Sequence, residues 1–138
     1  MSDFQLDARL AADSHWIADA PLSQLRLMDD ARFPWLVLVP RVAAASEWID
    51  LDEDAQQGLW AEVRQACRIL RAEPGCEKLN IGALGNIVRQ LHVHVVARRS
   101  GDAAWPGPVW GSGAAQRLAP DVLAERLARL REAWSATG

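Results

Sequence analysis

Two of the three histidines in this 138-residue chain lie two positions apart, in the stretch RQLHVHVVARR that begins at residue 89. In a β-strand, residues i and i+2 point to the same face, so Gln90, His92 and His94 are expected to form one polar row. Imidazole titrates near neutral pH, and such a row can supply a nucleophile, an acid or base, or metal ligands. Taken alone, the pair is equally compatible with two exposed residues on an open sheet face.

Four segments carry strand patterns that could position these side chains. Residues 23–28 (SQLRLM) alternate polar and apolar, and residues 35–40 (WLVLVP) form a continuous apolar run that Pro40 stops. The turn formers between these two segments predict a hairpin. Residues 78–85 and 90–97 are predicted as the third and fourth strands, the last with Leu, Val and Val facing the core.

Two segments carry helical patterns. The first, residues 51–72, begins with three acidic residues, which the helix dipole favours, and is followed by Pro-Gly. The second, residues 120–136, opens with a proline suited to a first turn. Each has one apolar face, made of Leu59, Val63, Cys67 and Leu70 in the first helix and Leu123, Leu127, Leu130 and Trp134 in the second. The order predicts an α+β fold, an antiparallel sheet with the helices packed on one face.

Composition narrows the function classes. A single domain over residues 1–138 is expected from the length, and a net charge of −3 argues against nucleic acid or an anionic membrane surface as a partner. No apolar run approaches the ~20 residues of a membrane span, and the acidic N-terminus is unlike a signal peptide. Cys67 and Cys76 match no zinc spacing, so reduced thiols and a cytoplasmic location are expected.

The segment GNIVRQLHVHVVARRSGD resembles the signature of the histidine triad (HIT) superfamily, His-φ-His-φ-His-φ-φ with φ apolar. His92 matches the middle histidine and His94 the third, and Gly85-Asn86 matches the upstream Gly-Gln or Gly-Asn step. The hairpin LRLMDDARFPWLVLVPR is also similar to the family's first hairpin, so the resemblance covers roughly residues 22–102. It implies a HIT-like fold, with an antiparallel sheet of about five strands and two main helices packed on one face. It also implies a homodimer and a nucleotide as small-molecule ligand, with no cofactor or metal.

The chain departs from the family pattern at two positions. Gln90 replaces the first histidine, and glutamine can donate and accept hydrogen bonds but carries no proton charge near neutral pH. Ile87 stands where the family often has Ser or Thr as a phosphate donor. The resemblance to a Gln-φ-His-φ-His-φ-φ variant supports the fold. The two changes are expected to affect the reaction rate and the choice of substrate more than the fold.

The resemblance implies that His92 attacks the α-phosphorus of a nucleoside phosphoramidate or a (di)nucleotide. A covalent nucleotidyl-histidine forms, and water or another acceptor resolves it, which makes the chain a hydrolase or nucleotidyl transferase. His94 would hold a phosphate oxygen and Gln90 would brace the site. Asn80 and Asn86 are expected to bind phosphate as neutral donors.

The turn after the first strand is expected to hold the nucleoside. Met28, Asp29 and Asp30 occupy it, and either aspartate could accept from ribose hydroxyls, although ordinary turn chemistry explains them equally well. His15 is expected to lie outside the site. Arg98 is expected to attract phosphate, whereas Arg89 and Arg99 are interpreted as exposed charges.

The tryptophans form two predicted groups. Trp16, Trp35, Trp60 and Trp134 are expected to pack the core or a subunit interface. Trp105 and Trp110, in a loop rich in Pro and Gly, could instead wall the substrate pocket or reach across a dimer.

Two alternatives to the enzyme remain at this point. One is a catalytically weak or inactive nucleotide-binding protein on the same fold, with its triad eroded to Gln-His-His. The other is a metal enzyme in which His92 and His94 join a carboxylate, as in cupin barrels. Cupins lack two long amphipathic helices, which makes the metal enzyme the weaker alternative.

Overall fold

The structure is a computed structural model that describes residues 3–137. Its centre is a five-stranded sheet in the order β1-β2-β3-β5-β4, with each neighbouring pair antiparallel. The strands are β1 (Ser14–Asp19), β2 (Ser23–Met28), β3 (Trp35–Pro40), β4 (Lys78–Gly82) and β5 (Val93–Arg98). This sheet confirms the predicted α+β class and strand number.

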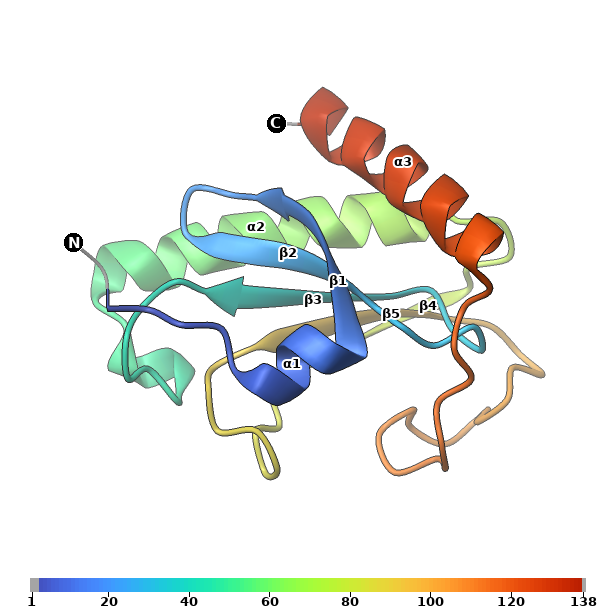
Figure 1. Cartoon of the computed structure of the whole chain (residues 1–138), viewed down its shortest axis with the longest axis horizontal. Coiled ribbons are helices and arrows are strands. Elements are labelled where there is room, and N and C mark those ends of the chain that lie inside the picture. Colours follow the sequence, from blue (N-terminus) through green and yellow to red (C-terminus); the bar gives the residue numbers. More distant parts are fainter. Residues whose placement is uncertain (1–2, 138) are drawn as a thin grey trace.

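Two long helices, α2 (Glu53–Arg71) and α3 (Pro120–Thr137), cover one face of the sheet, as predicted. Figure 1 shows α2 running along the sheet and α3 lying at an angle to α2, near the C-terminal end of α2. A short helix, α1 (Ala8–Asp13), and the long loop before α3 lie on the opposite side in the same view (Figure 1). A 3₁₀ turn, η1 (Trp48–Asp50), precedes α2, and Asp52 caps α2 through the amide of Ala55. Within residues 3–137, no helix combines the length and apolar character needed to cross a bilayer.

Strand boundaries agree with the sequence pattern in the first hairpin and differ around the histidines. The strand predicted over 78–85 ends at Gly82, and the one predicted over 90–97 begins at Val93. On β3, the last residue paired with β5 is Leu38, opposite Val93, so the chain before Val93 has no partner in the ladder. The amide of Leu91 instead donates to the carbonyl of Ala45, outside the sheet, at 3.0 Å.

Two elements near the N-terminus were missing from the sequence prediction. Helix α1 has only six residues, capped by the Asp7 carboxylate, which accepts from the amides of Arg9 and Leu10. Strand β1 pairs with β2, but its register shifts between Trp16 and Ala18. This bulge breaks the alternation that would have identified the strand.

The two faces of the sheet bury different side chains. Leu91, Val93 and Val95 pack with α2 and α3 in the main core, as predicted. The opposite face carries a second cluster, in which Trp35 and Val96 pack with residues of the flanking loops. His92 and His94 lie on this second face and are 7% and 6% exposed, so it is not an open sheet face.

The tryptophans only partly follow the prediction. Trp35 and Trp134 are buried, whereas Trp16 and Trp60 are 45% and 59% exposed and do not belong to either core. Trp110 lies against the ring of His94, with 5.5 Å between ring centroids.

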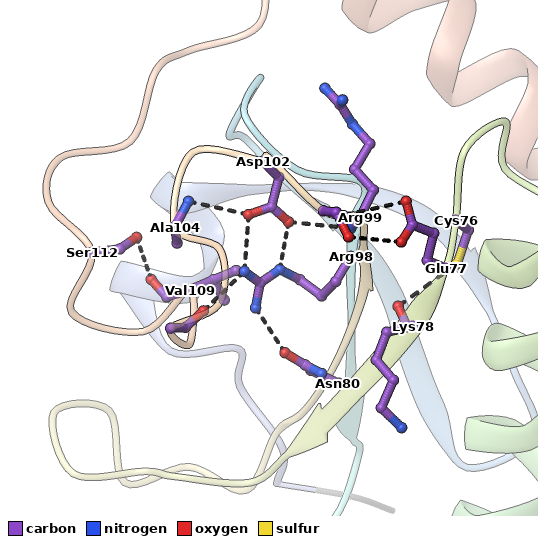
Figure 2. A network of polar contacts seen from close by, with 12 residues as sticks. Cys76, Glu77, Lys78, Asn80, Arg98, Arg99, Asp102, Ala104, Val109 and Ser112 are labelled. Atoms are coloured by element: carbon purple, nitrogen blue, oxygen red, sulfur yellow. Dashed lines mark hydrogen bonds and ion pairs between the residues drawn. The ribbon is translucent and has the colours of Figure 1, made fainter.

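The loop over the second face is anchored by a buried ion pair (Figure 2). Arg98 donates to both carboxylate oxygens of Asp102, at 2.7 and 2.9 Å, and these side chains are 2% and 3% exposed. Arg98 also donates to Asn80 Oδ1 and to the carbonyl of Gly107, and its guanidinium lies over the ring of Trp105. The expectation that Arg98 attracts phosphate is therefore wrong, because its donors are used to hold the loop.

Breaking this pair is expected to destabilise the fold. Arg98→Leu leaves the Asp102 carboxylate buried without its cation, which costs about 3–5 kcal/mol in similar cases. Urea unfolding should show a loss of that size, while Arg64→Leu, at an exposed position on α2, should change stability by less than about 0.5 kcal/mol. Equal stabilities for the two variants would contradict the anchoring role.

Candidate active site

A cavity of about 650 Å³ opens on the second face of the sheet. His92 and His94 line it, which brings the histidine pair to the edge of a volume suited to a small ligand. Its other walls come from α1, from loop residues 84–88, from the loop before α3, and from the end of β2 and the turn after it, through Met28, Asp29, Asp30 and Arg32. Residues far apart in the sequence thus converge on the two imidazoles.

The tautomer of His92 follows from its hydrogen bond. The Nδ1 atom lies 2.7 Å from the carbonyl oxygen of Gln90. A carbonyl can only accept, so Nδ1 carries the hydrogen and Nε2 of the neutral ring holds a free lone pair. His92 therefore has one nitrogen fixed by the main chain and the other available for attack.

His94 has the opposite tautomer. The indole Nε1 of Trp35 lies 2.9 Å from His94 Nδ1, and an indole can only donate. His94 Nδ1 is therefore the acceptor, and Nε2 carries the hydrogen. Burial lowers the pKa of His94 to about 3, and the neighbouring His92 adds to this effect. The ring stays neutral at physiological pH and can donate from Nε2 to a phosphate oxygen.

The two rings form a compact pair. Their centroids lie 4.8 Å apart and their planes meet at 74°. A lone pair on one ring and an N–H on the other suit attack on phosphorus beside a donor to its oxygen.

The aspartates of the predicted nucleoside site both line the cavity, together with Met28. Burial opposes ionisation of Asp29, but hydrogen bonds from the Leu118 amide, His15 and Arg117 outweigh it and lower the pKa to about 2. The pKa of Asp30 is also lowered, because the hydrogen bonds led by Arg32 outweigh its burial. Through these hydrogen bonds, both carboxylates connect the turn after β2 to the loop before α3 and so hold the cavity wall together.

The other predicted site residues are distributed unevenly. Asn86 lines the cavity, and Ile87 beside it is 78% exposed, so the chain offers no hydroxyl there. Among the described residues, the cavity lining does not include Asn80, whose side-chain oxygen accepts from Arg98. Gln90 is also outside the lining, and its amide bonds the main chain at Gln5 and Asp7.

Sequence reasoning missed two contributions to the site. Arg9 and Leu10 reach the cavity from α1, and the capping residue Asp7 before an alanine-rich segment was the available signal for that helix. Trp35 was assigned to packing, and no local pattern links it to His94. His15 was expected to lie outside the site, and the cavity lining in the described part of the chain does not include it. Its Nε2 lies 3.0 Å from Oδ2 of the lining residue Asp29.

The cavity contains both signs of charge. Arg32 and Arg117 each bond a carboxylate, whereas Arg9 makes no ion pair within 4.0 Å in the described part of the chain.

Over residues 3–137, no group of three or more His, Cys, Asp and Glu side chains is arranged to hold a metal ion.

The buried neutral His94 predicts a pH-dependent stability. Its pKa is lower in the folded chain than the ordinary value of 6.5, so the unfolded chain binds the proton first as the pH falls. Stability should decrease by about 1.4 kcal/mol per pH unit below 6.5. In His94→Gln the slope between pH 6 and pH 5 should be smaller by about that amount, as measured by urea unfolding. An unchanged slope in the variant would show that His94 is not the group responsible.

The Trp35 hydrogen bond predicts a single His94 tautomer. Nitrogen-15 NMR of the imidazoles should show His94 only as the Nε2–H form in the wild type. Trp35→Phe removes the donor to Nδ1 and should give a mixture of both forms. Trp134→Phe, which changes a buried tryptophan on α3, serves as the control and should leave the His94 signals unchanged. A single tautomer retained in Trp35→Phe would contradict this assignment.

Comparison with known proteins agrees with the fold and with the motif. A family model described as the HIT domain matches residues 9–101. A histidine triad protein from Bradyrhizobium japonicum is 46% identical, with 94% of this chain and 96% of that one covered and a TM-score of 0.90. One from Sinorhizobium meliloti is 48% identical over the same shares, with a TM-score of 0.91.

A third histidine triad protein, from Marinobacter aquaeolei, is 38% identical over 98% of both chains, with a TM-score of 0.94. The NitFhit protein of C. elegans is 16% identical, with 96% of this chain and 29% of that one covered and a TM-score of 0.67, a likeness of fold alone. No curated protein matches the chain significantly. The family model covers most of the chain and the three bacterial proteins cover nearly all of it, so the chain belongs to the HIT-domain family.

Proposed function

We propose that this protein is a nucleotide hydrolase or nucleotidyl transferase that uses His92 as its nucleophile. The observation that carries the proposal is the opposite pair of tautomers in the cavity. His92 presents a lone pair at Nε2, while the neighbouring His94 presents an N–H. Membership of the HIT family supports a nucleotide as the ligand.

In the proposed reaction, His92 Nε2 attacks the α-phosphorus of a nucleoside phosphoramidate or a (di)nucleotide. A P–N bond to the ring forms and the bond to the leaving group breaks, and the leaving group takes its proton from solvent. The ring becomes a cation whose Nδ1–H stays bonded to the carbonyl of Gln90, which stabilises it. Water then attacks the same phosphorus and gives up a proton to solvent, and the P–N bond to His92 breaks. The nucleoside monophosphate is released, and the ring returns to its neutral form with the hydrogen on Nδ1.

The remaining cavity residues suit the binding of this substrate. His94 donates from Nε2 to a phosphate oxygen and Asn86 lies within reach as a neutral donor. Met28 provides an apolar surface for the nucleoside, and Asp29 Oδ1, which accepts only from the Leu118 amide, retains a lone pair for a ribose hydroxyl. Asp30 already accepts four hydrogen bonds, from Arg32 and the Gln116 amide, so its part is to hold the wall beside Asp29. Asn80 is left out of this site because it is bonded to Arg98. A homodimer and a cytoplasmic location remain expectations from the sequence.

One observation favours the alternative of a nucleotide-binding protein with little activity. Gln90 stands at the first triad position, and both ends of its amide are bonded to the main chain of residues 5 and 7. No ionisable group at that position can then assist the leaving group. The two functions differ in whether His92 turns substrate over.

Turnover of an adenosine phosphoramidate with a fluorogenic amine tests the proposal. His92→Ala should lower kcat by at least about 10³-fold, because the attacking nitrogen is lost. His92→Gly should be equally inactive, and added imidazole should restore part of the rate by filling the vacated space. A wild type that binds AMP in calorimetry but shows no turnover would establish the binding protein instead.

A further inference from the structure

Gln90 holds the N-terminal segment of the chain, residues 5–7, which we name the arm. Its side-chain oxygen accepts from the amide of Asp7 at 2.9 Å, and its side-chain nitrogen donates to the carbonyl of Gln5 at 2.8 Å. These groups belong to residues two apart in the arm, so the primary amide pairs with main chain much as a neighbouring strand does. More than 80 residues separate the partners in the sequence.

Glutamine suits this task better than the histidine it replaces. Its amide places a donor and an acceptor side by side at the end of one flexible side chain. Neutral imidazole has its donor and acceptor on separate corners of a rigid ring, and the protonated ring has no acceptor. A histidine at position 90 would leave the Asp7 amide or the Gln5 carbonyl without its partner.

The arm leads directly into a wall of the cavity. Asp7 caps α1, and α1 brings Arg9 and Leu10 to the cavity lining. Helices of six residues are not stable alone in water, so α1 depends on contacts at its ends and on burial of Leu10, which is 4% exposed. Gln90 fixes the end of α1 that lies nearest to Arg9.

The same residue also orients the nucleophile. The carbonyl of Gln90 accepts from His92 Nδ1, so the side chain holds the arm and the main chain holds the reactive ring. Substitution of the side chain removes the first contact and keeps the second. The two roles of Gln90 can therefore be separated by mutation.

Arg9 is the cavity cation best placed to bind an anion. Arg32 and Arg117 are each bonded to a carboxylate, while in the described residues Arg9 forms no ion pair. Arg9 is exposed at the cavity, so the N–H groups of its guanidinium can donate to a ligand.

We propose that Gln90 is a positioning residue that fastens the arm so that α1 holds Arg9 over the cavity, where Arg9 binds a phosphate oxygen of the nucleotide. This inference rests on the proposed function for its ligand. It assigns the first triad position to substrate binding through the arm, and it makes Arg9 a specificity-determining residue for the anionic group.

Amide hydrogen exchange of the ligand-free protein tests the arm contact without any activity. Gln90→Leu and Gln90→His should both raise exchange across residues 5–13 by about tenfold or more, because local opening becomes easier. Gln57→Leu, at an exposed glutamine on α2, is the matched control and should leave exchange unchanged. Unchanged exchange in both Gln90 variants would overturn the proposal.

Steady-state kinetics on the adenosine phosphoramidate test the consequence for binding. Gln90→His should raise KM about tenfold and lower kcat by much less, and Arg9→Ala should raise KM by a similar factor. The double variant Gln90→Leu/Arg9→Ala should be little worse than either single one, because both act through the same contact. Arg64→Ala, at an exposed arginine on α2, should leave KM unchanged.

Two results would overturn the proposal. One is a higher kcat in Gln90→His with an unchanged KM, which would make position 90 an ordinary triad position. The other is an unchanged KM in Arg9→Ala. If the wild type shows no turnover, the proposed function fails separately, and the Kd for AMP from calorimetry replaces KM in each comparison.

Discussion

Two hydrogen bonds of opposite sense at neighbouring imidazoles set the chemistry of this cavity. A main-chain carbonyl accepts from His92 Nδ1, and the Trp35 indole donates to His94 Nδ1. One ring therefore offers a lone pair and the other an N–H, although the two are the same amino acid. This difference lasts only while both rings are neutral, since a protonated ring has N–H groups at both nitrogens. Burial of His94 lowers its pKa to about 3 and keeps that ring neutral.

The fold supplies this burial from the neighbouring strand β3, through Trp35, and from a loop that lies over the sheet. The histidines lie on the face opposite the long helices, and the loop before α3 covers them through Val109 and Trp110. Arg98 holds that loop through the ion pair with Asp102, whose pKa the Arg98 hydrogen bonds lower to about 2. A pair of this kind keeps its strength across the pH range in which the imidazoles must stay neutral.

Local patterns in the sequence predicted the elements with strong periodicity. The strands at residues 23–28 and 35–40 and both long helices follow from alternation, capping and helical spacing, and the residue pair His92 and His94 follows from its motif. Strand β1 was not predicted, because its bulge breaks the alternation of polar and apolar residues. The role of Trp35 depends on the register between β3 and β5, and no single-strand pattern contains that register.

The roles of charged residues were harder still to predict. Arg98 follows the motif, and this position suggested a phosphate ligand. Its ion pair with Asp102 could not be predicted, because it depends on how the loop after β5 folds back over the sheet. Gln90 was rightly singled out as the departure from the triad. Its bonding to the arm could not be inferred, because the partners are main-chain groups more than 80 residues away.

The central claim is that Nε2 of His92 is the attacking atom, and trapping of its adduct tests this most directly. Wild-type protein mixed with the adenosine phosphoramidate and quenched in alkali, where phosphoryl-histidine bonds persist, would be examined by intact-mass spectrometry. The account predicts an added adenylyl group that peptide mapping places on His92 and that is absent from His92→Ala. Turnover without any adduct, or an adduct on another residue, would contradict it.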